Sequence, residues 1–138
     1  VRTTGNPDVH MVLRGGNDQP NYQASDIAVT MEKLEKAEIK TSIMVDCSHA
    51  NSCKDHTRQE AVMNDVMDQV ANGNSSIGSL MIESFLNEGN QKMADKLEDL
   101  TYGVSITDKC VNWKTTERML RHAHAKLKEC GGRKLSKV

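Results

Sequence analysis

The sequence predicts an α/β fold that is built on a parallel sheet. Three short runs rich in β-forming residues alternate with longer segments whose apolar residues follow a helical period. Strands that alternate with helices pair in parallel through right-handed crossovers. The predicted elements follow the order strand, helix, strand, helix, strand, loop, helix, and three strands are too few to close a barrel. Three strands alone would leave one face of the sheet open, whereas parallel sheets are usually covered on both faces. We therefore expect the core to be shared with sequence outside this chain.

The first unit begins with a predicted strand at residues 9–14, which stops at the turn signal of Gly15 and Gly16. Ser25 is predicted as the N-cap of a helix that continues to about Glu38. Three apolar residues with the spacing of one helical face are predicted to form its buried side: Ile27, Met31 and Leu34.

The second unit repeats this plan, with a strand at residues 41–47 and a loop at 48–52. A helix is predicted over about 55–71, and Gly73 is a natural residue for its termination. Valines at four-residue spacing are predicted to form its buried face: Val62, Val66 and Val70.

The third unit begins with a strand at residues 77–83 that ends in the carboxylate of Glu83. A long polar loop follows to about residue 108, and loops of this length are usually functional or disordered. The last helix is predicted over about 115–129. Its inner face is predicted to consist of Leu120, Ala123 and Leu127.

The composition fits a single domain that binds neither nucleic acid nor a membrane. The 138 residues carry a net charge of −1, and aromatic residues make up only 3% of them. The basic tail with Arg133, Lys134 and Lys137 is too short for a nucleic-acid arm, and we expect it to be solvated. No apolar run approaches the ~20 residues that span a bilayer. The four cysteines lack a CxxC pair, and we expect free thiols in a cytoplasmic protein.

The candidate site lies where the predicted strands end, which is where active sites lie in α/β barrels. The first strand ends in Arg14, the second leads through Asp46 to His49, and the third ends in Glu83. Asp108 closes the long loop that follows. His49, Glu83 and Asp108 suit a divalent metal such as Mn, Fe, Co or Zn. Arg14, followed by two glycines that allow close approach to the backbone, suits a phosphate.

Each of these residues also has an ordinary structural interpretation. Arg14 can be an exposed turn residue, and His49 a hydrogen-bonded loop histidine. Glu83 can be a strand-end charge in a salt bridge, and Asp108 can cap the final helix. Cys47 and His49 can share a zinc ion, although Cys47 as a plain strand residue is the simpler interpretation. The shared placement of the four polar residues at one end of the sheet favours function.

Six ordered motifs resemble type I 3-deoxy-D-arabino-heptulosonate 7-phosphate (DAHP) synthases, and together they span the chain up to about residue 130. In sequence order they are Gly5-Asn6-Pro7-Asp8-Val9-His10, Leu13-Arg14-Gly15-Gly16, Asp46-Cys47-Ser48-His49-Ala50-Asn51-Ser52, Met81-Ile82-Glu83-Ser84, Glu88-Gly89-Asn90-Gln91 and Tyr102-Gly103-Val104-Ser105-Ile106-Thr107-Asp108.

The resemblance implies a TIM (β/α)8 barrel, with residues 1–138 as its last three βα units in one domain. It implies a transferase that joins phosphoenolpyruvate to erythrose 4-phosphate, the first step of the shikimate pathway. His49, Glu83 and Asp108 match three of the family's four metal ligands, and Arg14 matches a residue that binds the phosphate of phosphoenolpyruvate. His49 and Asp108 are also candidates for proton movement. A homo-oligomer is expected for the complete enzyme.

Several family features have no match in this chain. The fourth metal ligand is a cysteine of the N-terminal half, which is missing, as is the Lys-Pro-Arg-Thr substrate motif. Cys47 replaces an aromatic residue, and Val104 stands where some members have Lys. We therefore expect a C-terminal fragment that is inactive alone. A truncated, non-catalytic protein that binds metal or a complementary chain is the second hypothesis, and another phosphate-using barrel enzyme is the third.

Overall fold

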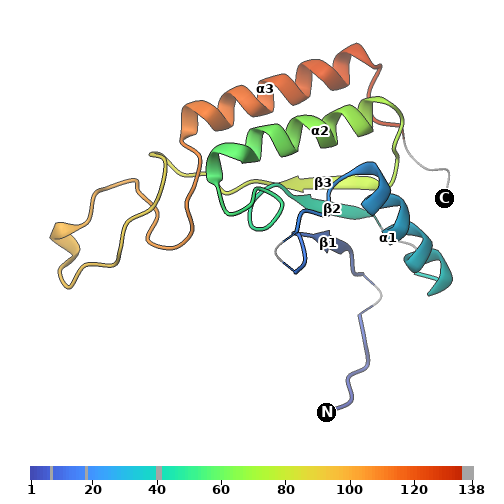
Figure 1. Cartoon of the computed structure of the whole chain (residues 1–138), viewed down its shortest axis with the longest axis horizontal. Helices are drawn as coiled ribbons and strands as arrows, with labels where there is room; N and C mark the ends of the chain where they lie inside the picture. The colour runs from blue at the N-terminus through green and yellow to red at the C-terminus, as the bar shows by residue number, and fades with distance from the viewer. Residues whose placement is uncertain (7, 18, 40–41, 135–138) are drawn as a thin grey trace.

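The computed structural model describes residues 1–6, 8–17, 19–39 and 42–134. In these residues the chain forms three strands and three α-helices in the predicted alternating order. Figure 1 shows the second and third helices running side by side above a small sheet, with the first helix beside the strands. The predicted start of the second strand at residue 41, Pro7 of the first motif and Lys137 of the tail lie outside the described residues.

The sheet has the parallel order β1-β2-β3, as the strand and helix alternation predicts. Its strands are β1 (Met11–Leu13), β2 (Ile43–Asp46) and β3 (Ile77–Met81), each shorter than the predicted run. Leu13 pairs with Val45, and Val45 pairs with Leu80. All three strands therefore end at the same edge of the sheet.

Helices α1 (Ala24–Lys36) and α2 (Gln59–Ala71) cover one face of this sheet. The core beneath them joins residues of all three strands to both helices: Leu13, Ile27, Leu34, Ile43, Val45, Val66, Val70 and Ile77. This set confirms Val66 and Val70 of the second helix and Ile27 and Leu34 of the first, with Met31 half-buried beside them. The remaining predicted valine, Val62, is buried in a second cluster between α2 and the last helix.

The opposite face of the sheet lacks a covering layer in the described part of the chain. Side chains alternate between the two faces of a strand, so the residues between the core positions point away from the helices. Val12, Met44 and Ser79 occupy paired positions there, and Val12 is 40% exposed. The expectation that three strands alone leave one face open is confirmed.

Two helix predictions are wrong in detail. The N-cap of α1 is Gln23 rather than Ser25, because the carboxylate of Asp26 accepts the backbone N–H of Gln23. In α3 (Trp113–Glu129), Leu120 is 52% exposed, and Met119 is buried in its place. Ala123 is buried as predicted, and Leu127 is half-buried beside it. The buried face of α3 packs on α2 and on residues at the ends of β2 and β3, and Met119 rather than Leu120 points into that cluster.

The connection from β3 to α3 extends away from the sheet at the end where the strands finish (Figure 1). It includes a short 3₁₀ helix, Leu97–Asp99, and is held by loop-to-loop hydrogen bonds such as that from Gln91 N–H to the carbonyl oxygen of Ser105, 2.8 Å. A second 3₁₀ turn, His56–Arg58, precedes α2.

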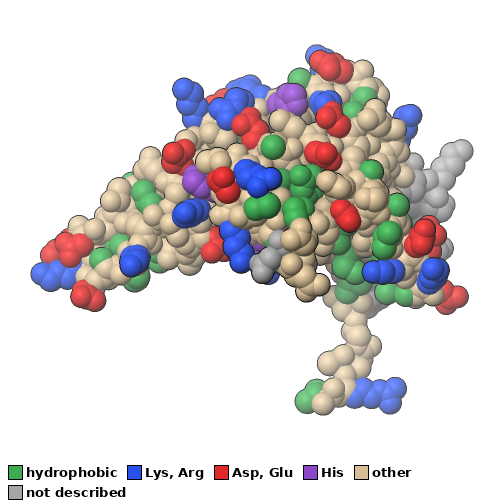
Figure 2. All heavy atoms as spheres, viewed as in Figure 1, with side chains coloured by type: hydrophobic (Ala, Val, Ile, Leu, Met, Phe, Trp, Pro, Cys, Tyr) green, Lys and Arg blue, Asp and Glu red, His purple; other side chains and the backbone are tan. Residues whose placement is uncertain are grey.

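The surface agrees with the near-neutral composition. Basic and acidic side chains are interspersed over the face shown in Figure 2. None of the described helices combines the length and the apolar character that a membrane crossing needs. All four cysteines are free thiols, as predicted.

Candidate metal centre

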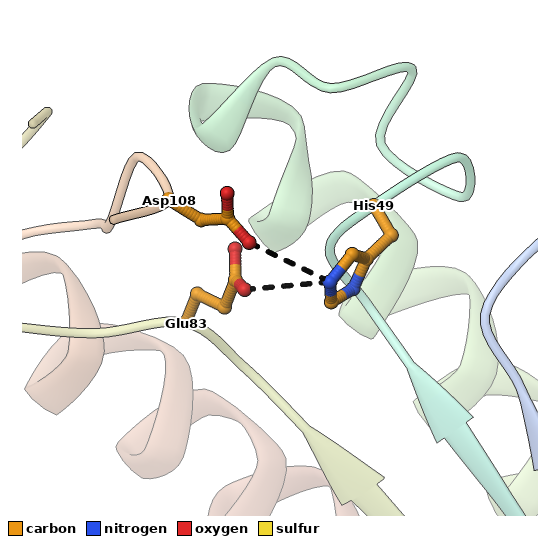
Figure 3. Close-up of side chains that lie close together, drawn as sticks. All are labelled: His49, Glu83 and Asp108. Atoms are coloured by element: carbon orange, nitrogen blue, oxygen red, sulfur yellow. Dashed lines mark ion pairs between the residues drawn. The ribbon is translucent and has the colours of Figure 1, made fainter.

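His49, Glu83 and Asp108 converge at the edge where the strands end. Each offers one ligand atom, and these atoms all lie within 4.8 Å of one another. His49 Nε2 lies 3.6 Å from Glu83 Oε1 and 3.8 Å from Asp108 Oδ2 (Figure 3). The structure thus brings together the three residues that the sequence nominated as metal ligands, although they are far apart in the chain.

The three ligands come from different local structures. His49 belongs to the tight loop after β2 and has a φ of 50°, a conformation that is uncommon for a residue other than glycine and often marks a functional site. Glu83 lies two residues beyond the end of β3. Asp108 lies near the end of the long loop, and its side chain is 69% exposed.

Asp108 does not cap the last helix, contrary to its ordinary structural interpretation. The N-cap of α3 is Asn112, whose side chain accepts the backbone N–H of Thr115 at 2.8 Å. Asp108 is therefore available to the site.

Cys47 offers no zinc site with His49, because its side chain is fully buried in the cluster between α2 and α3. Burial raises the pKa of the Cys47 thiol to about 12, which disfavours the thiolate that zinc requires.

The carboxyl group of Glu83 lies in a partly buried and negatively charged environment. Partial burial raises the pKa of its carboxyl group, and the nearby carboxylates of Asp108 and Asp46 raise it further, while His49 acts in the opposite direction. Carboxylates crowded in this way repel one another until a cation or a proton joins them. Together with one imidazole nitrogen, they form a mixed nitrogen and oxygen donor set that fits a divalent transition metal.

A cleft of about 490 Å³ contains this group of side chains. Arg14, the fourth residue nominated from the sequence, lines the same cleft together with Gly15 and Gly16. Gly15 has a φ of 83°, which favours glycine, and a Cβ there would collide with Ala50. The glycine therefore allows the β1 turn to lie against the His49 loop. The cleft volume suits a small ligand.

Buried polar residues that the sequence analysis did not nominate fix this arrangement. Asn51 donates to the carbonyl oxygens of Leu13 and Asp46 and accepts the N–H of Asn21, so it ties the ends of β1 and β2 together. Gln59 of α2 accepts the N–H of Glu83 at 2.8 Å and donates to its carbonyl oxygen at 3.2 Å.

A polar residue on an otherwise apolar helix stripe is the signal that could have identified Gln59. It lies three and seven positions before Val62 and Val66, both of which are buried. Its side chain is fully buried as well. Buried amides are normally retained where they satisfy specific partners.

The fold and the site define an α/β protein with a candidate divalent-metal centre at the carboxyl edge of a parallel sheet. Comparison with known proteins makes this assignment specific. The model of the DAHP synthetase I family matches residues 1–121, so the chain belongs to that family.

The relatives agree on the family but are longer than this chain. A Tyr-sensitive phospho-2-dehydro-3-deoxyheptonate aldolase of Escherichia coli K12 is 47% identical over 127 residues, which are 92% of this chain and 35% of that protein. A putative enzyme of the same name from Schizosaccharomyces pombe is 49% identical over 84% of this chain and 32% of its own length. The chain therefore spans about a third of these relatives.

A solved structure agrees with the fold as well. The phospho-2-dehydro-3-deoxyheptonate aldolase of Francisella tularensis SCHU S4 superposes with a TM-score of 0.83 at 43% identity, over 91% of this chain and 36% of that chain. The similarity thus extends to the arrangement of the sheet, the helices and the long loop, and it leaves most of the solved chain without a counterpart here.

Proposed function

We propose that residues 1–138 are the C-terminal part of a single (β/α)8-barrel DAHP synthase domain, contributing its last three βα units. The complete enzyme would join phosphoenolpyruvate to D-erythrose 4-phosphate and release phosphate. The observation that carries this proposal is the convergence of His49, Glu83 and Asp108 beside Arg14, in a chain that belongs to this family. The open sheet face at Val12 supports a core completed by further barrel segments.

The residues of the cleft have distinct roles in this proposal. His49, Glu83 and Asp108 would hold a divalent metal, with Mn, Fe, Co and Zn all compatible with the donor set. A bound metal supplies Lewis-acid polarisation of the aldehyde oxygen of erythrose 4-phosphate. The guanidinium of Arg14 would grip the phosphate of phosphoenolpyruvate by charge-assisted hydrogen bonds. Gly15 and Gly16 leave room for that phosphate to approach the backbone.

Proton movement is assigned to Asp108 and His49. Asp108 is the most exposed of the three ligands, at 69% against 24% for His49, so it has the freest access to a substrate in the cleft. His49 presents Nε2 to the same space and is the second candidate for contact with substrate. We further propose a cytoplasmic homo-oligomer, in keeping with the four free thiols.

The site assignment is tested by Glu83→Ala in the full-length protein. We expect loss of metal-dependent synthase activity and loss of tight metal binding, because one of two half-buried ligands is removed. The matched control is Glu98→Ala, which removes a 77% exposed carboxylate from the long loop and should leave both properties unchanged. Unchanged turnover in Glu83→Ala would contradict the assignment.

A non-catalytic, partner-dependent protein is the alternative, and it is motivated by the fourth metal ligand and the substrate motif that have no match in this chain. The decisive measurement is the intact mass of the protein from its native source. A mass well above the 15.3 kDa of this chain supports the complete synthase. A mass near that value, with a chain that sediments as a folded monomer or binds a complementary chain, supports the alternative.

A further inference from the structure

Asp46, the last residue of β2, is a buried carboxylate whose hydrogen-bond partners all lie on the loop that carries His49. Its side chain is 1% exposed. Oδ1 accepts the backbone N–H of Ser48 at 2.8 Å and its hydroxyl at 2.6 Å. Oδ2 lies 2.6 Å from His49 Nδ1. A carboxylate this deeply buried is stable only with such partners, so its position and the loop conformation depend on each other.

This contact determines which nitrogen of His49 faces the cleft with a lone pair. An ionised carboxylate only accepts hydrogen bonds, so Nδ1 must carry the proton that it donates to Asp46. The hydroxyl of Ser48 also lies 2.7 Å from Nδ1 and, since it donates to Asp46, presents a lone pair there. Nε2 is then unprotonated and points toward Glu83 and Asp108.

We propose that Asp46 is a positioning residue for the metal centre, which selects the Nδ1-protonated tautomer of His49 and fixes the orientation of its ring. The inference rests on the proposed metal-binding function of His49, Glu83 and Asp108. Histidine ligands bind a metal through a neutral nitrogen, and a carboxylate on the other nitrogen both orients the ring and strengthens it as a donor. Asp46 would not touch the metal or the substrate.

The test is Asp46→Asn in the full-length protein, with Co²⁺ affinity as the first readout. An amide cannot reproduce both sets of contacts. If its oxygen stays at His49 Nδ1, its NH₂ meets the two donors of Ser48. If the amide group is rotated the other way, its NH₂ faces His49 Nδ1 and favours the tautomer whose Nε2 is protonated. Loss of comparable carboxylates behind histidine ligands lowers metal affinity by about 10–100-fold, and we expect a loss in that range here.

The second readout is the tautomer of the His49 ring, which can be tested in the wild-type protein as well as in the variant. In the metal-free protein labelled with ¹⁵N-histidine, the ring nitrogens of neutral His49 should show the proton on Nδ1, with the signal assigned by its disappearance in His49→Gln. Asp46→Asn should move the proton toward Nε2. A neutral wild-type ring with the proton on Nε2 overturns the proposal, and so does unchanged Co²⁺ affinity in a folded Asp46→Asn protein.

Two further variants separate the possible causes. Asp65→Asn removes a carboxylate from an exposed position on α2, so it controls for the change in net charge and should not alter the affinity. Glu83→Ala tests the metal centre itself. If Glu83→Ala binds Co²⁺ as the wild type does, the proposed metal function fails. If only Glu83→Ala loses affinity and Asp46→Asn does not, the centre stands and the role of Asp46 fails.

Discussion

Replacing Gln59 by methionine should destabilise the protein by leaving one backbone group at the candidate metal centre without a partner. The native amide makes two hydrogen bonds to Glu83, at 2.8 Å to its N–H and 3.2 Å to its carbonyl oxygen. The carbonyl oxygen keeps a second donor, the N–H of Val111 at 2.9 Å. The N–H of Glu83 would lose the acceptor it has in Gln59, and an orphaned group of this kind costs about 1–3 kcal/mol.

Methionine is the right substitution because it is unbranched and close to glutamine in length. It fills the space of a side chain that is fully buried, so water cannot easily replace the amide. We therefore expect the free energy of unfolding to fall by about 1–3 kcal/mol. We also expect the Glu83 amide to lose protection against hydrogen exchange.

The assay is urea unfolding of the full-length protein, combined with hydrogen exchange of the Glu83 amide. Gln69→Met is the matched control on the same helix. Its amide donates to the carbonyl oxygen of Tyr22 at 2.9 Å and to the exposed carboxylate of Asp65 at 2.7 Å. Because its replacement leaves no backbone N–H without an acceptor, the loss should stay below about 1 kcal/mol. Equal stability of Gln59→Met and the wild type, or unchanged protection of the Glu83 amide, would refute the reasoning.

Two further predictions follow from burial and backbone geometry. Iodoacetamide at neutral pH should label exposed Cys53 quickly and Cys47 only on unfolding, because burial raises the pKa of Cys47 from 9.0 to about 12. The folded protein holds the thiol proton of Cys47 more tightly than the unfolded chain does. The free energy of unfolding should therefore also fall as the pH rises above about 9, which the urea midpoint at each pH measures. Gly15→Ala should lower stability by more than about 1 kcal/mol, because its φ is 83° and its Cβ would collide with Ala50. Gly16→Ala, whose Cβ meets nothing within 4 Å, should be neutral in the same urea assay, and equal midpoints for the two variants would contradict this account.

The strand and helix order and most of the core were predictable because they depend on local patterns. Val62, Val66 and Val70 share one face at four-residue spacing whatever their partners are, and all three are buried. The buried side of α3 was less predictable, because it depends on the angle at which this helix meets α2. That angle buries Met119 and leaves Leu120 exposed.

His49 and Glu83 were predictable as neighbours because parallel strands finish at one edge, so residues just beyond the strand ends lie close together. Asp108 lies on the long loop, and its place beside them depends on how that loop folds back. The residues behind them were not predicted, although the positions of Asp46 and Gln59 carry a signal. Gln59 is a polar residue on a helix face whose valines are buried, and Asp46 ends a strand that contains the buried residues Ile43 and Val45. The structure buries both polar residues. Their roles depend on hydrogen bonds that no periodicity reveals, such as the contact of Gln59 with a residue 24 positions away.

The three candidate ligands are held in place by different contacts. We therefore expect them to play different parts when a metal binds. The ring of His49 is held by a buried carboxylate and the backbone of Glu83 by a buried amide, so both positions are fixed before any ligand arrives. Asp108 is 69% exposed on a loop whose hydrogen bonds run mainly to other loop residues, such as that from Asn90 to the carbonyl oxygen of Thr107. Preorganised donors lose little entropy on binding, whereas an exposed side chain without such contacts loses rotamer freedom when it binds. His49 and Glu83 should therefore determine where a metal binds, and Asp108 should complete its coordination from the open side of the cleft.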